Sequence, residues 1–207
     1  MELWLDNLLT QPAEAILLIA LLLGGALIAG YTLRTGVPPM PTSRMVRHAM
    51  LDALPARVGG VIYELGSGWG GMAVALAERY PNNRVIGIEL SPLPWAWSRL
   101  RLTVRPRPNL TFRRADFLKL PLGDAGAVTF YLMIGAMIPL AAKLRGELTP
   151  GAVIVSNAFA LRGWEPDAVI PVADTGATRV YRYRAGQTVA CSPESDRDSD
   201  SDQGEDA

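Results

Sequence analysis

The sequence predicts an α/β fold: a doubly wound, mostly parallel sheet that ends in an antiparallel hairpin and is preceded by one transmembrane helix. Three observations predict it. Short apolar runs alternate with helix-like segments, a glycine turn follows the first run, and an uncharged segment lies near the N-terminus. The 207 residues suffice for one globular domain. With Cys191 and His48 as the single cysteine and histidine, the chain forms neither an intrachain disulfide nor a Cys/His metal site.

The first expected element is a transmembrane helix over residues 15–33, nineteen uncharged residues that follow a short flank, 1–14. A cleaved signal peptide is the alternative. The acidic flank, the length of the run and the lack of a small-x-small cleavage site before Tyr31 favour a retained anchor. Basic residues follow the segment and only acids precede it, which places the N-terminus outside and the body in the cytoplasm, at the cytoplasmic (inner) membrane.

A proline-rich linker is expected over 34–41 and the folded domain over 42–185. Thr42 or Ser43 can cap a helix that runs to about Leu54. Ser91 followed by Pro92 is a helix-start signal. Strands are expected over 61–65, 84–89, 110–115, 126–133 and 152–158, and helices over 70–80, 92–104 and 135–147.

The alternation of strands and helices stops after the fifth strand. Residues 168–172 and 178–183 flank a turn-forming segment, 174–177, and therefore predict a hairpin. No full helix fits between the fifth strand and this hairpin. Residues 186–207 form an acidic, low-complexity tail that is expected to be disordered.

The net charge of zero hides a segregation along the chain. Residues 34–190 carry 19 Lys and Arg against 10 Asp and Glu, whereas 191–207 carry seven acids and one arginine. A basic body suits an anionic partner such as lipid headgroups or nucleic acid, although an arginine-rich solvated surface has the same composition.

The glycine turn after the first strand predicts a nucleoside-binding loop. Gly66, Gly68 and Gly70, with Ser67 between them, let the backbone turn sharply and approach a ligand. In an open parallel sheet, the ligand crevice lies at the carboxyl ends of the strands. Glu89 ends the second strand there and is placed to accept hydrogen bonds from ribose hydroxyls.

The same glycine spacing also fits the dinucleotide fingerprint, so a nicotinamide cofactor is the alternative. Glu64 ends the first strand, where it would repel a pyrophosphate but favour a cationic amino-acid group and a sulfonium. Asp116 follows the third strand, where it can bind an adenine amino group or cap the residues after it. No second domain remains for a redox substrate. Together these residues favour S-adenosylmethionine.

The loop Glu64–Gly70 resembles the first motif of class I methyltransferases, which have a Rossmann-like fold, and residues 87–92 resemble the second. Over about residues 38–184 the chain resembles, more narrowly, the small membrane-associated lysine methyltransferases of the ATP synthase c-subunit and the adenine nucleotide translocase. The further matching segments are the lead-in to Thr42, 143–151, 155–161 and 164–166. The chain departs from that family at Trp69, where an acid is usual, and at Gly71, where arginine is usual.

The resemblance implies methyl transfer to an amine, with a protein lysine as the acceptor and a membrane protein as the substrate. Trp69 and Tyr131 are expected to form walls of the acceptor pocket, and Thr42 to close over the cofactor; the sequence identifies no catalytic acid or base. Methylation of phospholipid headgroups and a non-catalytic membrane scaffold are the alternatives. Nucleic acid is not expected as a partner, because the chain lacks an aromatic and basic stacking cluster. The oligomeric state is not predicted.

Overall fold

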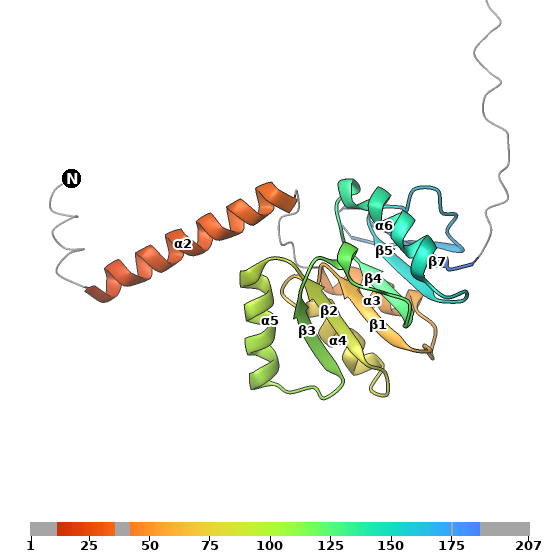
Figure 1. The fold of residues 1–207 in the computed structure, drawn as a ribbon, viewed down its shortest axis with the longest axis horizontal. Helices are drawn as coiled ribbons and strands as arrows, with labels where there is room; N and C mark the ends of the chain where they lie inside the picture. The colour runs from red at the N-terminus through yellow and green to blue at the C-terminus, as the bar shows by residue number, and fades with distance from the viewer. Residues whose placement is uncertain (1–11, 36–41, 175, 187–207) are drawn as a thin grey trace, which may run out of the picture.

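The computed structural model describes residues 12–35, 42–174 and 176–186 (Figure 1). Residues 1–11 of the expected flank, residues 36–41 of the expected linker and all but the first residue of the expected acidic tail lie outside these residues. The helices are α2 Pro12–Thr35, α3 Arg44–Ala53, α4 Gly71–Arg79, α5 Pro92–Val104, the 3₁₀ helix η1 Phe117–Lys119 and α6 Ile134–Glu147. The strands are β1 Val61–Leu65, β2 Val85–Glu89, β3 Leu110–Arg114, β4 Ala125–Phe130, β5 Val153–Asn157, β6 Ala168–Pro171 and β7 Arg179–Arg184.

Seven strands form one sheet in the order β3-β2-β1-β4-β5-β7-β6. The first five strands are parallel, and β7 runs antiparallel to both β5 and β6. The doubly wound sheet with an antiparallel hairpin at its edge is therefore confirmed. Since β1 lies between β2 and β4, the strand order reverses there, and the carboxyl ends of these strands flank the crevice where ligands bind in such sheets.

Helices cover both faces of the sheet (Figure 1). On one face, α3 and α4 bury Met50 and Leu76 against the sheet, and α5 adds Trp95 and Leu102 at the border of the same core. On the other face, α6 buries Leu140 and Leu144. The β1 strand is buried along almost its whole length because it lies between these two layers.

Helix α2 is the segment in which the transmembrane helix was predicted. Its stretch Ala13–Tyr31 is the one described helix that is long and apolar enough to cross a membrane. Its large apolar side chains are exposed, with Ile16 and Leu21 each about two-thirds accessible. The apolar window of the helix is not buried in the described part of the chain, although the helix contacts α5.

The fourth strand is shorter than expected, since β4 ends at Phe130 and not at Met133. Phe130 pairs with Leu65 of β1 and Ser156 of β5, which are at or next to the ends of those strands. Beyond Phe130 there is no ladder to join, and Met133 instead takes the N-cap position of α6. This shortening leaves Tyr131 in the loop at the carboxyl edge of the sheet.

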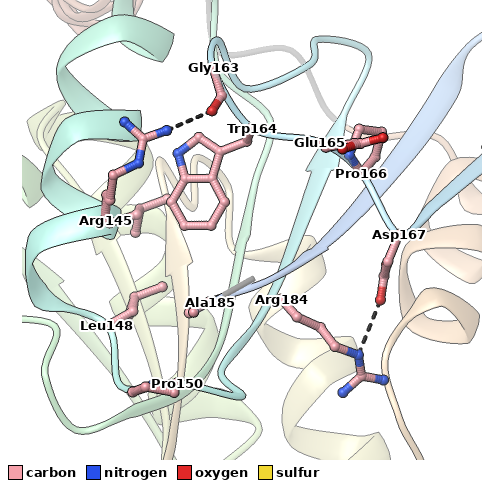
Figure 2. Close-up of a pocket in the computed structure, with 12 residues that line it drawn as sticks. Arg145, Leu148, Pro150, Gly163, Trp164, Glu165, Pro166, Asp167, Arg184 and Ala185 are labelled. Atoms are coloured by element: carbon pink, nitrogen blue, oxygen red, sulfur yellow. Dashed lines mark hydrogen bonds and ion pairs between the residues drawn. The ribbon is translucent and has the colours of Figure 1, made fainter. Parts of the chain in front are cut away.

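The segment between β5 and β6 contains no helix, as predicted, and is held by Trp164 instead. The indole Nε1 of Trp164 donates to the carbonyl of Ala141 in α6 at 3.2 Å. Its ring meets Tyr183 edge-on, with the centroids 6.2 Å apart, and the Arg145 guanidinium lies 5.3 Å from the ring centroid. Figure 2 shows this tryptophan and Arg145, whose Nη2 donates to the Gly163 carbonyl at 2.6 Å.

We expect Trp164→Ala to lower the free energy of unfolding by about 3 kcal/mol, because it removes a large aromatic group that joins the loop to α6. Urea denaturation followed by circular dichroism measures the change. Trp164→Phe keeps the aromatic contact and loses the indole hydrogen bond, so it is expected to cost only about 1 kcal/mol. Equal losses for the two variants would contradict the packing role.

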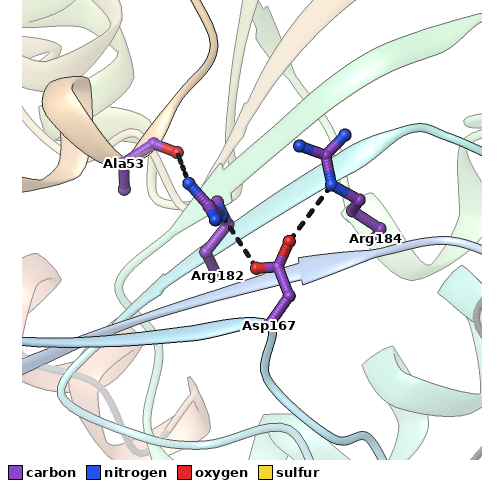
Figure 3. A network of polar contacts seen from close by, with 4 residues as sticks. All are labelled: Ala53, Asp167, Arg182 and Arg184. Atoms are coloured by element: carbon purple, nitrogen blue, oxygen red, sulfur yellow. Dashed lines mark hydrogen bonds and ion pairs between the residues drawn. The ribbon is translucent and has the colours of Figure 1, made fainter.

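An ion-pair network stabilises the start of the β6–β7 hairpin. The Asp167 carboxylate accepts from Nε of Arg182 at 2.8 Å and from Nε of Arg184 at 3.1 Å (Figure 3). Arg182 also reaches the carbonyl of Ala53 in α3. These contacts fix the antiparallel strand against the helical layer on the α3 side.

Candidate functional site

A cavity of about 300 Å³ lies at the carboxyl ends of the parallel strands. Seven of the ten residues that the sequence singled out line it together: Thr42, Glu64, Gly66, Ser67, Gly68, Trp69 and Tyr131. The other three, Gly70, Glu89 and Asp116, are not among its lining residues. The larger groove in Figure 2, about 960 Å³, includes Pro150 and Gly186 and therefore lies at the opposite end of the sheet.

The three glycines of the loop all have positive φ angles, of 70° at Gly66, 51° at Gly68 and 77° at Gly70. Their surroundings differ. A Cβ on Gly70 would meet the Phe112 ring at 2.7 Å, whereas nothing lies within 4 Å of a Cβ on Gly68. Gly70 therefore permits close packing of the loop on the core, and Gly68 is the point where the backbone is open to a ligand.

Because the surroundings of Gly70 and Gly68 differ, alanine is expected to lower stability at Gly70 and ligand affinity at Gly68. Gly70→Ala is expected to lower the free energy of unfolding by about 3 kcal/mol, because it adds a clash to an unfavourable φ. Gly68→Ala carries only the conformational cost, about 1 kcal/mol, but places a methyl group where the ligand must approach. Denaturation and ligand calorimetry on both variants separate the effects, and a Gly68→Ala protein with unchanged affinity would contradict the role given to Gly68.

Glu89 fixes the loop from the end of β2. Its Oε2 accepts from the backbone N–H of Gly68 at 2.7 Å, and its Oε1 accepts from the N–H of Ser91 at 2.7 Å. The residue is buried, with 9% of its surface exposed. Glu89 thus positions the loop, and the predicted contact to ribose remains a prediction.

Glu64 is a carboxyl group buried at the end of β1, with 3% of its surface exposed. Thr129, on the neighbouring β4, donates its hydroxyl to Oε2 of Glu64. Burial raises the pKa of Glu64 to about 8, against a smaller lowering by the Thr129 hydrogen bond. A cation bound beside Glu64 would favour its ionised form, and Glu64 is the one carboxyl group among the residues that line the cavity, beside Arg44, Arg47 and Arg101.

Two polar side chains near the site, those of Asp116 and Ser43, accept hydrogen bonds from the backbone at the start of a helix. The Asp116 carboxylate accepts from the N–H of Leu118 at 3.0 Å and caps η1, which is the structural alternative that the sequence left open. Its contact with adenine remains a prediction. Ser91 takes the N-cap position of α5, but its side chain makes no capping hydrogen bond. Ser43, not Thr42, caps α3, through a 3.2 Å hydrogen bond from Val46 N–H.

Sequence reasoning missed a set of cavity residues from the helices: Arg44, Arg47, Gly71, Met72, Trp97 and Arg101. Arg47 matters most, because its Nη2 donates to the Thr42 carbonyl at 3.2 Å and its guanidinium lies 3.7 Å from the Cβ position of Gly71. Gly71 is the position at which the resemblance described above led us to expect arginine. In the sequence, Arg44 and Arg47 count only toward the basic charge after the apolar segment, so nothing there predicts that they line the cavity.

The residues of the cavity fit the predicted cofactor. The Ser67 hydroxyl and the Nε of Arg47 are buried and have no hydrogen-bond partner among the described residues. Buried polar atoms of this kind are normally satisfied, so they indicate a polar ligand. Ser67, the open backbone at Gly68 and the buried Glu64 would together hold a polar molecule that carries a positive charge.

Comparison with known proteins agrees with this geometry. Residues 64–168 match the family described as the ANTKMT methyltransferase domain. A protein-lysine N-methyltransferase from Saccharolobus islandicus is 30% identical over 158 residues, which cover 73% of this chain and 95% of that protein. The adenine nucleotide translocase lysine N-methyltransferase of Mus musculus is 32% identical over 152 residues, 73% of this chain and 64% of that protein.

A solved structure is similar over the same region. The RNA methyltransferase from Salinibacter ruber, in complex with S-adenosyl-L-homocysteine, is 29% identical and has a TM-score of 0.63. The match covers 72% of this chain and 96% of that one. The solved structure shares the doubly wound domain with this chain, but it is named for RNA as the methyl acceptor, whereas the two sequence relatives are named for lysine.

Proposed function

The chain belongs to the family of the ANTKMT methyltransferase domain and is an S-adenosylmethionine-dependent methyltransferase, and from this premise we propose that it methylates lysine side chains of a membrane protein. The observation that carries the proposal is the cavity that joins a buried Glu64 to the aromatic residues Trp69 and Tyr131. The lysine methyltransferases among its relatives support the choice of acceptor.

When bound, S-adenosylmethionine supplies an electrophilic methyl group on a sulfonium. In our proposal Glu64 would bind the cationic amino-acid end of the cofactor, the Ser67 hydroxyl would bind one of its polar groups, and the open space at Gly68 would let it approach the loop. Glu89 keeps that loop in place through two backbone hydrogen bonds. These contacts orient the donor, which is the main requirement of an in-line displacement.

The acceptor amine must be neutral, although a free lysine is protonated near pH 7. Trp69 and Tyr131 line the cavity and would provide an apolar slot that lowers the lysine pKa, with its proton released to water. The same rings would attract the positively charged product through cation–π contacts. No general base is required by this arrangement.

We place the reaction at the cytoplasmic membrane, with α2 as the anchor and the N-terminus outside. The support is the exposed apolar surface of α2 and the arginines that follow it. A tethered enzyme meets membrane substrates at a high effective concentration. Phospholipid headgroup amines are the second candidate acceptor, because the same tether brings them to the cavity.

The test is the fate of tritium from labelled S-adenosylmethionine, incubated with the full-length enzyme and membranes from a strain that lacks its gene. We expect the label in protein and, after hydrolysis, in methyl-lysine. Label in the lipid extract or in RNA would overturn the lysine proposal. Glu64→Gln is the matched control for background labelling, and calorimetry with S-adenosylhomocysteine separately tests the cofactor site.

A further inference from the structure

Helix α5 has two apolar faces, and the fold uses only one of them. Trp95 and Leu102 pack against the core, and Ser98 is buried beside them. On the other side, Trp97, Leu100 and Val104 are 52%, 57% and 72% exposed. Their spacing of three and four residues aligns them along one stripe of the helix. The stripe is the outer face of α5.

The chain segment that carries the outer face of α5 contains only positive charges, one of which, Arg107, pairs with Glu78 of α4. From residue 90 to 115 the sequence contains six arginines and no acidic residue. Arg101 and Arg105 follow Trp97 and Leu100 along the helix at exposed positions, and Arg114 lies exposed on the adjacent edge strand β3. An apolar stripe bordered by arginines is typical of helices that lie in a membrane interface.

The end of the candidate membrane span meets this same region. Tyr31 is the last residue of the span, and its hydroxyl accepts from Nη2 of Arg114 at 3.2 Å. Helices α2 and α5 are in contact. In Figure 1, α5 forms the edge of the domain that faces α2 and runs crosswise to it. A bilayer crossed by α2 would therefore meet α5 lying along its surface.

We propose that the outer face of α5 is a docking surface for anionic lipid, with Trp97, Leu100 and Val104 inserted at the headgroup level and the arginines on the phosphates. This proposal rests on the membrane placement proposed above. Because Trp97 and Arg101 also line the cavity, docking sets the cavity beside the bilayer surface. The enzyme is then oriented toward amines that lie at the membrane–water boundary.

Charge favours lipid over a second copy of the chain as the occupant. A two-fold contact through α5 would bring the arginines of both copies together, and among the six only Arg107 forms an ion pair within the described residues, with Glu78. An anionic bilayer presents the opposite charge over its whole surface. Trp97 is also suited to the headgroup level, where tryptophan is enriched.

The test uses the full-length chain with Cys191→Ser and one new cysteine, labelled with an environment-sensitive nitrobenzoxadiazole dye. Leu100→Cys reports on the docking surface, and Ala142→Cys, an exposed position on α6 across the sheet, is the matched control. Proteins are reconstituted in vesicles of phosphatidylcholine, with or without phosphatidylglycerol. We expect the label at 100 to become about threefold brighter in the anionic vesicles and to be quenched by brominated lipid, with no change at 142.

Flotation of the same samples separates this proposal from the anchor. If the protein floats with both kinds of vesicle while the label at 100 stays as exposed as the label at 142, the anchor is supported and the docking proposal is overturned. A chain that floats only with anionic vesicles, with the label at 100 protected, supports docking and overturns the anchor. If the label at 100 becomes more shielded from water as the protein-to-lipid ratio rises, copies of the chain are in contact with each other. That result would also overturn the proposal.

A second variant tests the consequence for activity. Leu100→Glu with Val104→Glu places two charges on the outer face at positions that do not themselves line the cavity. We expect labelling of membrane substrate to fall about tenfold, while affinity for S-adenosylhomocysteine is retained. A variant with full activity on membranes would overturn the proposal.

Discussion

Glu64→Gln is expected to weaken S-adenosylmethionine binding about 100-fold at pH 8, because truncating one partner of a buried charge pair costs about 2.7 kcal/mol. The pH dependence is the sharper signature. In the wild type, Glu64 has a pKa of about 8 and must lose its proton to bind the cofactor ammonium, so affinity rises about tenfold per pH unit up to pH 8. In Glu64→Gln the affinity for the cofactor is expected not to change with pH below 8. The two proteins are therefore expected to converge near pH 6 in calorimetric titrations.

The stability of the cofactor-free protein gives the control. A carboxyl group with a raised pKa binds its proton more tightly in the folded than in the unfolded chain, so stability falls as the pH rises from 4.5 to about 8. Glu64→Gln removes this decline and is expected to be the more stable protein at pH 8. Thr129→Val removes the hydrogen bond that lowers the Glu64 pKa, so it should move the binding profile to higher pH. Equal pH slopes for wild type and Glu64→Gln would contradict the assignment.

Glu89→Ala is expected to weaken cofactor binding about 100-fold and to lower the free energy of unfolding by about 2 kcal/mol. The substitution leaves the N–H groups of Gly68 and Ser91 without their acceptor, so the loop loses its fixed position as well as the predicted ribose contact. Calorimetry and urea denaturation measure the two losses. Glu89→Gln keeps an acceptor oxygen and is expected to lose only about tenfold in affinity. A loss of stability with unchanged affinity would show that Glu89 serves the loop alone.

The regular elements of the fold were predictable because local pattern and tertiary packing agree there. The start of β1 at Val61, and the start and end of α5 at Pro92 and Val104, coincide with sequence signals. The end of β4 was not predictable from the same kind of signal. Leu132 continues the apolar run, but the partner strands have already ended and the chain turns toward α6.

The part of the site that lies in one strand and its glycine turn could be predicted from a local sequence pattern. The part that several helices contribute could not. Glu64 and Gly68 belong to a single strand–turn unit, and the structure places both at the cavity. Arg47 and Trp97 reach the same cavity from α3 and α5, which depends on how those helices pack across the sheet. No local pattern reports that packing. Asp116 follows the third strand as expected, but it caps η1 and is not among the residues that line the cavity.

The place of β7 in the sheet affects how the chain can fold during synthesis. Strand β5 is fully buried along its length, yet one of its edges is covered only by β7, which follows much later in the sequence. At usual rates of translation, roughly one to five seconds separate the two strands on the ribosome. Until then, Val153–Asn157 presents an unpaired apolar edge of the kind that templates aggregation. A nascent chain that stops before Arg179 is therefore expected to be a substrate for chaperones even though every parallel strand is complete.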